Sequence, residues 1–522
     1  MLTRRLLSRS GLAGPRQCSL KALTFIGSHG ARSIGCKSVR SISTIPLIIN
    51  GRDIETETTF PVISPLTEKA VWNASSASKQ HAADAVHAAQ AAFPAWSATK
   101  PSERRDLFLR TADVITRRKD ELGEYMHQEI GADKDYQDFI LGLSVEGLKD
   151  TAGRIAGAVQ GSVPESIHPG MRAMIEKRPY GVVLGIAPCR LRNAPYHLGL
   201  RSITFALATG NTTILKGPEF SPKCYWAIVD VFREAGLPEG CLNLLLHRPS
   251  DAASVTEALI AAPEVKKVNF TGSSMVGSVI ASLAGKYLKP SLMELGGKAS
   301  AIVLADADLD KAALHCARGA FMNAGQICMS TERILVHTSI ADRFEAKLKE
   351  QVKRHFGTVD TTPVLVTAAS ARRNRDLVKD AVSHGAQILN DAEVKSTSAQ
   401  LEHETRMCPT IVAGLKDEMK LFSNESFGPS VSFFTYEKEE EALALANGTD
   451  YGLSAAIFSE NLGTAFRLAR ALDSGAVHIN SMTVHDEFAL PHGGVKSSGF
   501  GRFNGYQGLE EFLYCKTVTW ME

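Results

Sequence analysis

The sequence predicts an α/β protein with a doubly wound parallel-sheet domain and a second α/β domain. Two observations lead to this prediction. From residue 174 onward, apolar runs of strand length alternate with segments of helical periodicity, and such alternation is typical of a parallel sheet covered by helices. The chain has 522 residues, of which 44% are hydrophobic and 22% charged, so it is too long for one ordinary core. We therefore expect two or three lobes.

Short strands and two helices are expected before the alternating region. The strands fall at 45–51 and 60–65, and the helices at 78–93 and 102–122. The first alternating series then has strands at 181–187, 212–216, 242–246 and 267–270, and helices at 195–209, 222–235, 252–262 and 275–286. A second series, from 300 to about 480, is assigned to a separate catalytic domain.

The first 44 residues differ in charge from the rest of the chain. They contain eight lysines and arginines and no acidic residue, and Leu2, Leu6 and Leu7 would share one face of a helix. These features are typical of a mitochondrial targeting segment, here cleaved near 40–44, and they predict a protein of the mitochondrial matrix. A cytoplasmic protein with a disordered basic tail or a mistaken start codon is the alternative.

The remaining chain excludes several classes of partner. It carries 50 basic and 56 acidic residues without a basic–aromatic stripe, so nucleic-acid binding is not expected. No apolar run reaches the roughly 18 residues that a membrane span needs. The nine cysteines form no Cys-x-x-Cys pair, so neither a zinc site nor a disulfide framework is indicated. Most of these cysteines are expected to be buried and inert.

Two turns are candidates for binding a dinucleotide. Gly272, Ser273 and Gly277 follow a strand and open a helix, where backbone N–H groups could bind a phosphate. Taken alone this signal is weak, because Gly-Ser turns before helices are mostly caps. Lys216 and Glu219 follow another strand at the ligand-binding edge of the sheet and could hydrogen-bond ribose hydroxyls; a solvated Lys/Glu turn is the alternative. An acid beside the ribose would oppose a 2′-phosphate, which favours NAD over NADP.

Glu294 and Cys328 are candidates for the chemistry. Glu294 lies in an apolar setting beside two glycines, where burial would raise the pKa of its carboxyl group toward that of a useful base. The alternative is an exposed Glu in a surface turn. Cys328 lies in a Gly-containing loop between a helical stretch at 312–322 and a strand at 333–336. Local N–H donors in such a loop can stabilise a thiolate or an oxyanion.

In combination, these segments resemble the NAD(P)-dependent aldehyde dehydrogenase superfamily over nearly all of the chain after residue 45. Glu-Leu-Gly-Gly-Lys, which starts at Glu294, and Gly-Gln-Ile-Cys, which ends at Cys328, resemble the two signatures of that family. The 34-residue gap from Glu294 to Cys328 matches its usual spacing. The resemblance implies that Cys328 is the nucleophile, that Glu294 is the general base and that Asn193 completes the oxyanion site.

The resemblance also implies the cofactor site and the domains. NAD would be bound by Lys216, Glu219, Gly272, Ser273, Gly277, Leu295, Glu425 and Phe427. The NAD-binding domain would comprise 45–164 and 181–294, and the catalytic domain 295–495. A small β oligomerisation extension would comprise 165–180 and 496–522. A homodimer or homotetramer is therefore expected.

The mechanism that the resemblance implies begins with attack of the Cys328 thiolate on an aldehyde. The Asn193 amide and the Cys328 backbone N–H hold the resulting alkoxide, and hydride transfer to NAD leaves a thioester. Glu294 then removes a proton from the water that hydrolyses the thioester. No metal is required.

One segment departs from the family pattern. The family's Ala-Pro-Trp-Asn is replaced by Ala-Pro-Cys-Arg-Leu-Arg-Asn at 187–193, which is three residues longer. Asn193 keeps the family's 23-residue separation from Lys216 and therefore receives the oxyanion role. Two arginines beside Asn193 could misplace it, and a shift of about 1 Å can cost on the order of 100-fold in rate. A mispredicted splice junction is the other explanation.

Two segments, 193–201 and 325–332, resemble those of salicylaldehyde and vanillin dehydrogenases, which implies an aromatic or other hydrophobic aldehyde. Tyr196 and Met329 could line an apolar pocket or belong to the core. No arginine that could bind a substrate carboxylate is evident near the Cys328 loop. A Cys/Glu thioesterase or acyltransferase, and a catalytically impaired oligomer of this fold, are the alternatives.

Overall fold

The computed structural model describes residues 43–187, 193–356, 362–390 and 403–522. The predicted targeting segment lies outside the described residues except for its last two positions, and the altered segment at 188–192 lies outside them as well. Within the described residues, no helix has both the length and the apolar character that crossing a membrane requires.

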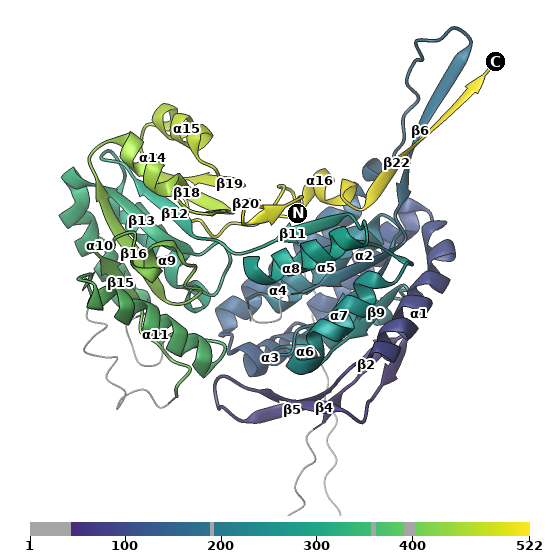
Figure 1. Cartoon of the computed structure of the whole chain (residues 1–522), viewed down its shortest axis with the longest axis horizontal. Helices are drawn as coiled ribbons and strands as arrows, with labels where there is room; N and C mark the ends of the chain where they lie inside the picture. The colour runs from purple at the N-terminus through teal and green to yellow at the C-terminus, as the bar shows by residue number, and fades with distance from the viewer. Residues whose placement is uncertain (1–42, 188–192, 357–361, 391–402) are drawn as a thin grey trace, which may run out of the picture. The chain divides into compact units, whose positions relative to one another are not determined.

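An eight-stranded sheet forms the centre of the first lobe (Figure 1). Its order is β21-β11-β10-β7-β8-β9-β2-β3, and the five strands from β11 to β9 are parallel. The strands are β2 (Leu47–Ile49), β3 (Arg52–Ile54), β7 (Val182–Ile186), β8 (Thr212–Lys216), β9 (Leu242–Leu245), β10 (Val265–Thr271), β11 (Ser291–Glu294) and β21 (Gly499–Phe500). The parallel sheet is the one that the alternating pattern predicts.

Helices cover both faces of this sheet, which confirms the doubly wound arrangement. α1, α7 and α8 form one layer, while α5 and α6 pack on the strands with α2, α3 and α4 behind them. The helices are α1 (Lys79–Ser97), α2 (Pro101–Arg117), α3 (Lys119–Ile130), α4 (Lys134–Ala158), α5 (Pro195–Ala208), α6 (Pro222–Glu234), α7 (Ala252–Ala261) and α8 (Ser274–Lys286). Every residue of α5 is buried, because this helix lies between the sheet and two other helices.

The N-terminal helices differ from the prediction in three ways. α1 continues through Pro94 to Ser97, because a proline within the last turn removes little of the hydrogen-bond ladder. The helix expected at 102–122 is divided at Arg118 into α2 and α3. α4 was not predicted, and it packs closely on later parts of the chain. A Cβ atom on its Gly147 would lie 2.3 Å from the ring of Phe488.

A seven-stranded sheet forms the centre of the second lobe, in the order β14-β15-β16-β13-β12-β18-β19. All neighbouring strands are parallel except β14 and β15. The strands are β12 (Ala299–Val303), β13 (Thr331–His337), β14 (Gln387–Ile388), β15 (Thr410–Ala413), β16 (Ser430–Tyr436), β18 (Ser454–Phe458) and β19 (Ala476–Ile479). The helices beside them are α9 (Leu309–Phe321), α10 (Ala341–Phe356), α11 (Ala368–Ser383), α14 (Glu439–Asn447) and α15 (Leu462–Ala471). Separate apolar clusters fill the two sides of this sheet.

Smaller sheets complete the described chain. β6 (Met171–Pro179) and β22 (Leu513–Met521) form an antiparallel ribbon that extends away from both large sheets (Figure 1). β1 (Thr44–Ile45), β4 (Thr59–Ile63) and β5 (Ala70–Ser75) form a three-stranded sheet, and β17 (Tyr451–Gly452) pairs with β20 (Val495–Lys496). β21 lies in the predicted extension at 496–522, yet it joins the first large sheet beside β11.

The connection between the two large sheets is short. Glu294 ends β11 in the first sheet, and Ala299 begins β12 in the second. Only residues 295–298 separate them, so the carboxyl end of β11 lies at the junction of the two lobes. Side chains from both lobes can therefore meet there.

Candidate active site

Cys328 follows a turn with unusual backbone geometry. Asn323, Ala324 and Gly325 have consecutive positive φ angles of 49°, 59° and 70°. A Cβ atom on Gly325 would lie 2.3 Å from the carbonyl oxygen of Gly428, so the position requires glycine. Backbone strain of this kind is concentrated at functional sites. The turn leads the chain to Cys328, whose side chain is buried.

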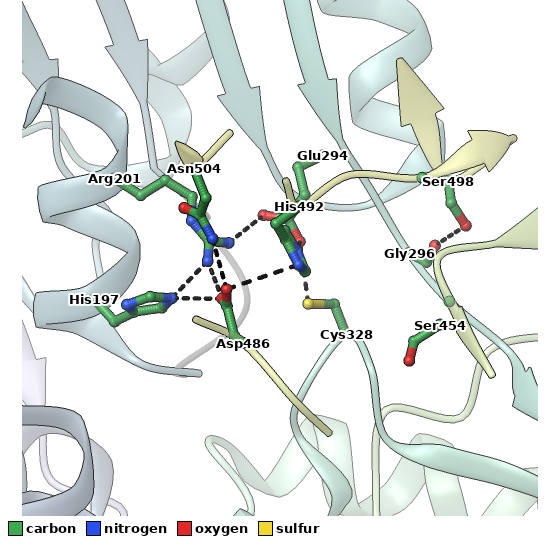
Figure 2. Close-up of polar contacts among 12 residues, drawn as sticks. His197, Arg201, Glu294, Gly296, Cys328, Ser454, Asp486, His492, Ser498 and Asn504 are labelled. Atoms are coloured by element: carbon green, nitrogen blue, oxygen red, sulfur yellow. Dashed lines mark hydrogen bonds and ion pairs between the residues drawn. The ribbon is translucent and has the colours of Figure 1, made fainter. Parts of the chain in front are cut away.

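Glu294 is fully buried and contacts the thiol directly. The Sγ atom of Cys328 donates to Oε1 of Glu294 at 3.1 Å (Figure 2). Two glycines allow the surrounding backbones to approach closely. A Cβ atom on Gly297 would lie 2.2 Å from the carbonyl oxygen of Cys328, and one on Gly499 would lie 2.0 Å from that of Met293. The fold thus brings together the predicted nucleophile and the predicted base.

The charge environment of Glu294 corrects one prediction. Nη1 of Arg201 lies 3.6 Å from Oε2 of Glu294, and Nε2 of His492 lies 3.6 Å from Oε1. Burial raises the pKa of Glu294, but His492 and the charge of Arg201 outweigh burial and lower this pKa to about 2. The expected upward shift is therefore wrong, because two basic side chains from distant parts of the chain face the carboxylate.

The thiol has the opposite shift. Burial, together with the negative charge of Glu294, raises the pKa of Cys328 well above its ordinary value. The thiol is therefore protonated before reaction, while the carboxylate beside it is ionised. In this pairing the ionised carboxylate accepts the hydrogen bond of the thiol.

Asp486 anchors the basic side chains around Glu294 (Figure 2). Its carboxylate forms an ion pair with Arg201, lies 2.8 Å from Nε2 of His197 and accepts a 2.8 Å hydrogen bond from Asn504. Burial raises the pKa of Asp486, but the charges of Arg201, His492 and His197 outweigh burial and hold this pKa well below its ordinary value. Asp486 is thus an ionised carboxylate, fixed in position, that balances the positive charge beside the reacting pair.

Asn193 lies two residues before α5 and borders the same cavity as Cys328. This cavity is lined by Asn193, Leu198, Thr271, Gly272, Leu295, Gly296, Cys328 and Glu425. The hydroxyl group of Tyr136 lies 3.5 Å from Oδ1 of Asn193, which is a weak hydrogen bond at best. That contact does not involve the Nδ2 donor group, which is the group that an oxyanion would need.

The turn at the start of α8 carries three of the predicted cofactor residues, Gly272, Ser273 and Gly277. The N–H of Gly272 donates to the Glu294 carbonyl at 3.0 Å, and that of Gly277 to the Ser273 carbonyl at 2.8 Å. Sheet and helix bonding thus uses these two N–H groups, and cofactor binding by the turn stays a prediction. Gly277 provides space, since a Cβ atom there would lie 2.4 Å from the Leu295 side chain.

Lys216 and Glu219 lie at another point of the same sheet edge. Lys216 ends β8 and is buried, and Glu219 is partly exposed in the turn that follows. Burial and the charge of Lys216 lower the pKa of His247 to about 3. Neither Lys216 nor Glu219 lines the cavity beside Cys328. Their place at the carboxyl ends of parallel strands fits a ribose site, and that role stays a prediction.

The segment that carries Glu425 and Phe427 contacts a buried ion pair between Lys298 and Glu332. Glu425 accepts the N–H of Gly297 at 2.8 Å, and burial together with the charge of Glu332 raises its pKa to about 7. Phe427 has a φ of 48°, and its N–H donates to Glu332 at 3.0 Å. Glu332 also accepts a 2.6 Å hydrogen bond from Lys298. The Lys298–Glu332 pair therefore positions the segment that carries both predicted cofactor residues.

The groups around the cavity fit the nicotinamide end of NAD. Oγ1 of Thr271 is buried without a hydrogen-bond partner among the described residues, so this hydroxyl is available to a ligand. A Cβ atom on Gly296 would lie 2.8 Å from a carboxylate oxygen of Glu425, so glycine keeps this wall of the cavity open. Leu295 adds an apolar surface. The cavity beside the thiol thus combines a polar hydroxyl with an apolar wall. This combination suits the planar, polar nicotinamide ring.

The structure also places the residues that the sequence analysis considered for the substrate side. The Tyr196 hydroxyl donates to the carbonyl oxygen of Leu122 at 3.0 Å, so Tyr196 belongs to the core and does not line the described cavity. Met329 is buried as well. Arg201 lies beside the reacting pair although no arginine was evident there from the sequence. It is engaged with Asp486 and Glu294.

Sequence reasoning missed the side chains that support the reacting pair, namely Arg201, Asp486, His492, Lys298 and Glu332. Arg201 carried a usable signal, because it is a lone positive charge in an otherwise apolar helix and a buried charge must be paired. Asp486 and His492 carried none, because only folding brings the segment at 484–504 beside β11.

Together, the doubly wound domain and the contact of Cys328 with Glu294 at its ligand-binding edge fit an enzyme that works with a dinucleotide. Comparison with known families agrees, because the profile of the Aldehyde dehydrogenase family matches residues 52–518. The chain belongs to the aldehyde dehydrogenase family. This membership confirms the predicted class of enzyme, its small-molecule aldehyde substrate and NAD as its cofactor.

Several relatives match nearly the whole chain. A vanillin dehydrogenase from Pseudomonas fluorescens is 42% identical over 484 residues, which cover 91% of this chain and 97% of the relative. A salicylaldehyde dehydrogenase from Pseudomonas putida is 37% identical over 482 residues, with coverages of 91% and 97%. The crystal structure of a salicylaldehyde dehydrogenase from Pseudomonas putida G7, complexed with salicylaldehyde, superposes with a TM-score of 0.86 at 34% identity and covers 92% of this chain and 98% of that one.

Proposed function

We propose that this enzyme oxidises an aromatic aldehyde to its carboxylic acid through a covalent intermediate on Cys328. The observation that carries the proposal is the 3.1 Å contact between Sγ of Cys328 and Oε1 of Glu294. Cys328 borders a cavity that is also lined by three of the predicted NAD-binding residues, Gly272, Leu295 and Glu425. The names of the relatives, vanillin and salicylaldehyde dehydrogenases, support an aromatic ring in the substrate. The predicted hydrophobic-aldehyde class includes these compounds.

Three side chains perform the first step. Glu294 accepts the thiol proton, and Sγ of Cys328 attacks the aldehyde carbon to give a thiohemiacetal. The Asn193 amide borders the same cavity and stabilises the negative oxygen that forms, as oxyanion donors do. NAD held beside Gly272, Leu295 and Glu425 would supply the acceptor for the hydride of that carbon, and a thioester would remain on Cys328.

Glu294 also serves the second step. The thioester is hydrolysed by water, and a base must remove a proton from this water as it attacks. Once the thiol proton has left Glu294, its carboxylate is ionised at neutral pH, because its pKa is lowered to about 2. The same lowering weakens it as a base, but its place beside Cys328 makes it the group to which we assign the proton of the attacking water. Collapse of the tetrahedral intermediate then releases the carboxylic acid and returns the Cys328 thiolate.

NADH formation at 340 nm tests the proposal. We expect NADH from vanillin, salicylaldehyde and benzaldehyde in preference to acetaldehyde, and none from Cys328→Ala. Cys316→Ala is the matched control, because Cys316 is a buried cysteine of α9 outside the site. Cleavage of a thioester without NADH from any aldehyde would instead indicate the thioesterase or acyltransferase. NAD binding without turnover of any aldehyde would indicate the impaired oligomer.

We also propose a location and an assembly. The basic, acid-free residues 1–44 support delivery to the mitochondrial matrix, which fluorescence microscopy of the tagged full chain tests.

The ribbon of β6 and β22 exposes Tyr514, Trp520 and Met521, and exposed apolar side chains of this kind mark interaction surfaces. We therefore expect a homodimer or homotetramer through this ribbon. Sedimentation velocity measures the oligomer directly.

A further inference from the structure

His492 is a buried histidine between two carboxylates. Its Nε2 atom lies 3.6 Å from Oε1 of Glu294, and its Nδ1 atom lies 3.9 Å from Oδ1 of Asp486 (Figure 2). Nε2 of His492 and Oε2 of Glu294 are both buried without a hydrogen-bond partner among the described residues. Unbonded buried polar atoms cost free energy, so these two atoms in the reaction site require an explanation, and a catalytic role is one.

The fold holds His492 in this place. Its backbone N–H and carbonyl exchange hydrogen bonds of 2.9 Å and 2.8 Å with Phe503. Asp486, on the far side of the imidazole, is itself fixed by Arg201, His197 and Asn504. The fold therefore fixes the backbone that carries the imidazole and the carboxylate that lies beside its Nδ1 atom.

Glu294 needs a partner that removes the protons it takes up. It is fully buried, so it cannot release a proton directly to solvent. Burial raises the pKa of Glu294, but its contact with His492 and the charge of Arg201 lower this pKa to about 2. The site therefore favours the ionised carboxylate, and a proton that Glu294 takes up must pass to a neighbouring base.

We propose that His492 is a proton-relay residue that acts through Glu294. The inference rests on the proposed function and extends it. The S–H bond of Cys328 breaks and an O–H bond forms on Glu294; that O–H bond then breaks and an N–H bond forms at Nε2 of neutral His492. The products are a thiolate that attacks the aldehyde and an imidazolium between two carboxylates, Glu294 and Asp486.

The distances allow this transfer after a small movement. Nε2 and Oε1 must approach from 3.6 Å to about 2.9 Å for a hydrogen bond, which is a shift of less than about 1 Å. Hydrogen bonds of catalytic groups are often long before substrate binds and shorten in the reactive complex. Asp486 stabilises the imidazolium in the same way that a carboxylate supports the base of a catalytic triad.

Several charged groups surround this relay. Glu294 faces Arg201 and His492, and His492 lies within electrostatic range of His197 on α5 and of His478 at the end of β19. Glu425 acts on the thiol from within the second lobe, and its pKa is raised to about 7. Glu425 and His478 are therefore the other titratable groups for which the test must control.

Alkylation of Cys328 by iodoacetamide tests the relay without cofactor or aldehyde. The rate is measured by peptide mass spectrometry from pH 5 to pH 9, with N-acetylcysteine as a reference thiol. In the wild type we expect the rate to rise with an inflection between about pH 5 and 8, where histidines change charge. In His492→Phe we expect the inflection to disappear and the rate at pH 7.5 to fall by about tenfold or more.

Three further variants make the result specific. His492→Gln keeps polar groups at the site but cannot take up a proton, so it should also lose the inflection. Glu425→Gln and His478→Phe should keep it. An inflection that persists in both His492 variants, or that disappears only in Glu425→Gln, overturns the relay. The proposed function is tested separately, by NADH formation in the wild type and its loss in Cys328→Ala. A failure of the relay can therefore be distinguished from a failure of the proposed function.

Discussion

The Sγ atom of Cys328 lies 3.1 Å from Oε1 of Glu294, although the two residues belong to different lobes. Glu294 ends a strand of the eight-stranded sheet, and Cys328 precedes a strand of the seven-stranded sheet. Their contact lies at the short connection between those sheets. The reactivity of the thiol therefore depends on how the two lobes meet, and variants that shift this junction should lower activity even where the fold survives.

Asn193→Ala should lower kcat by about 100- to 1000-fold, because it removes one donor to the oxyanion while leaving the thiol in place. Steady-state NADH formation with vanillin measures this loss. Tyr136→Phe is the control variant. It removes only the hydroxyl that lies 3.5 Å from Oδ1 of Asn193, so its effect should be much smaller.

The kcat of Asn193→Ala also shows whether the longer segment at 187–193 leaves Asn193 in place or displaces it. A loss as large as that expected for an oxyanion donor means that Asn193 functions despite the longer approach to it. Unchanged kcat in Asn193→Ala would instead mean that the three-residue lengthening has displaced its amide from the reaction. Sequencing of the transcript across codons 187–193 tests the splice explanation independently.

Gly325→Ala should damage the site through the backbone. Gly325 has a φ of 70°, and an added Cβ atom would lie 2.3 Å from the carbonyl oxygen of Gly428. The turn before Cys328 must shift to accept it, at a cost of about 1–3 kcal/mol. We expect a lower melting temperature and a loss of kcat of about tenfold or more.

Gly142→Ala is the matched substitution for this test. Gly142 lies within α4, and a Cβ atom there meets nothing within 4 Å. Alanine at a helix-interior position of this kind stabilises by roughly 0.5–1 kcal/mol. The melting temperature of Gly142→Ala should therefore rise slightly while kcat stays unchanged. Equal behaviour of the two variants would contradict a special backbone requirement at Gly325.

Glu425 should make NADH binding depend on pH. Its pKa is raised to about 7, chiefly by burial and by the charge of Glu332, so it is protonated below this pH and ionised above it. The ionised carboxylate is the stronger acceptor for ribose hydroxyls. The affinity for NADH should thus increase by roughly fivefold as pH rises through 7. Fluorescence titration measures the affinity, and Glu425→Gln should remove the dependence; the same dependence in this variant would exclude Glu425 as its source.

Much of the first lobe follows from local sequence. β8 has the predicted bounds, Thr212 to Lys216, because a buried parallel strand is a continuous apolar run between turns. The end of α1 and the presence of α4 could not be predicted from local sequence. A proline near the helix terminus does not end α1, and α4 packs on the later segment around Phe488, which no local pattern reveals.

The reacting pair could also be found from the sequence, through the spacing of Glu294 and Cys328 within a family resemblance. The charge state of that pair could not. Arg201 and His492 lie 93 residues before and 198 residues after Glu294 in the chain, and only the folded chain brings them to 3.6 Å from its carboxylate. An apolar local setting therefore predicted the wrong direction for the pKa of Glu294.

The most direct test of Cys328 as the nucleophile and Glu294 as the hydrolytic base is to trap the intermediate. Glu294→Gln is mixed with vanillin and NAD, quenched in acid within seconds and digested for mass spectrometry. We expect an acyl group on the Cys328 peptide that persists longer than in the wild type, because water is no longer activated, and no adduct in Cys328→Ala. An acyl group on another residue, or undiminished turnover in Cys328→Ala, would contradict the account.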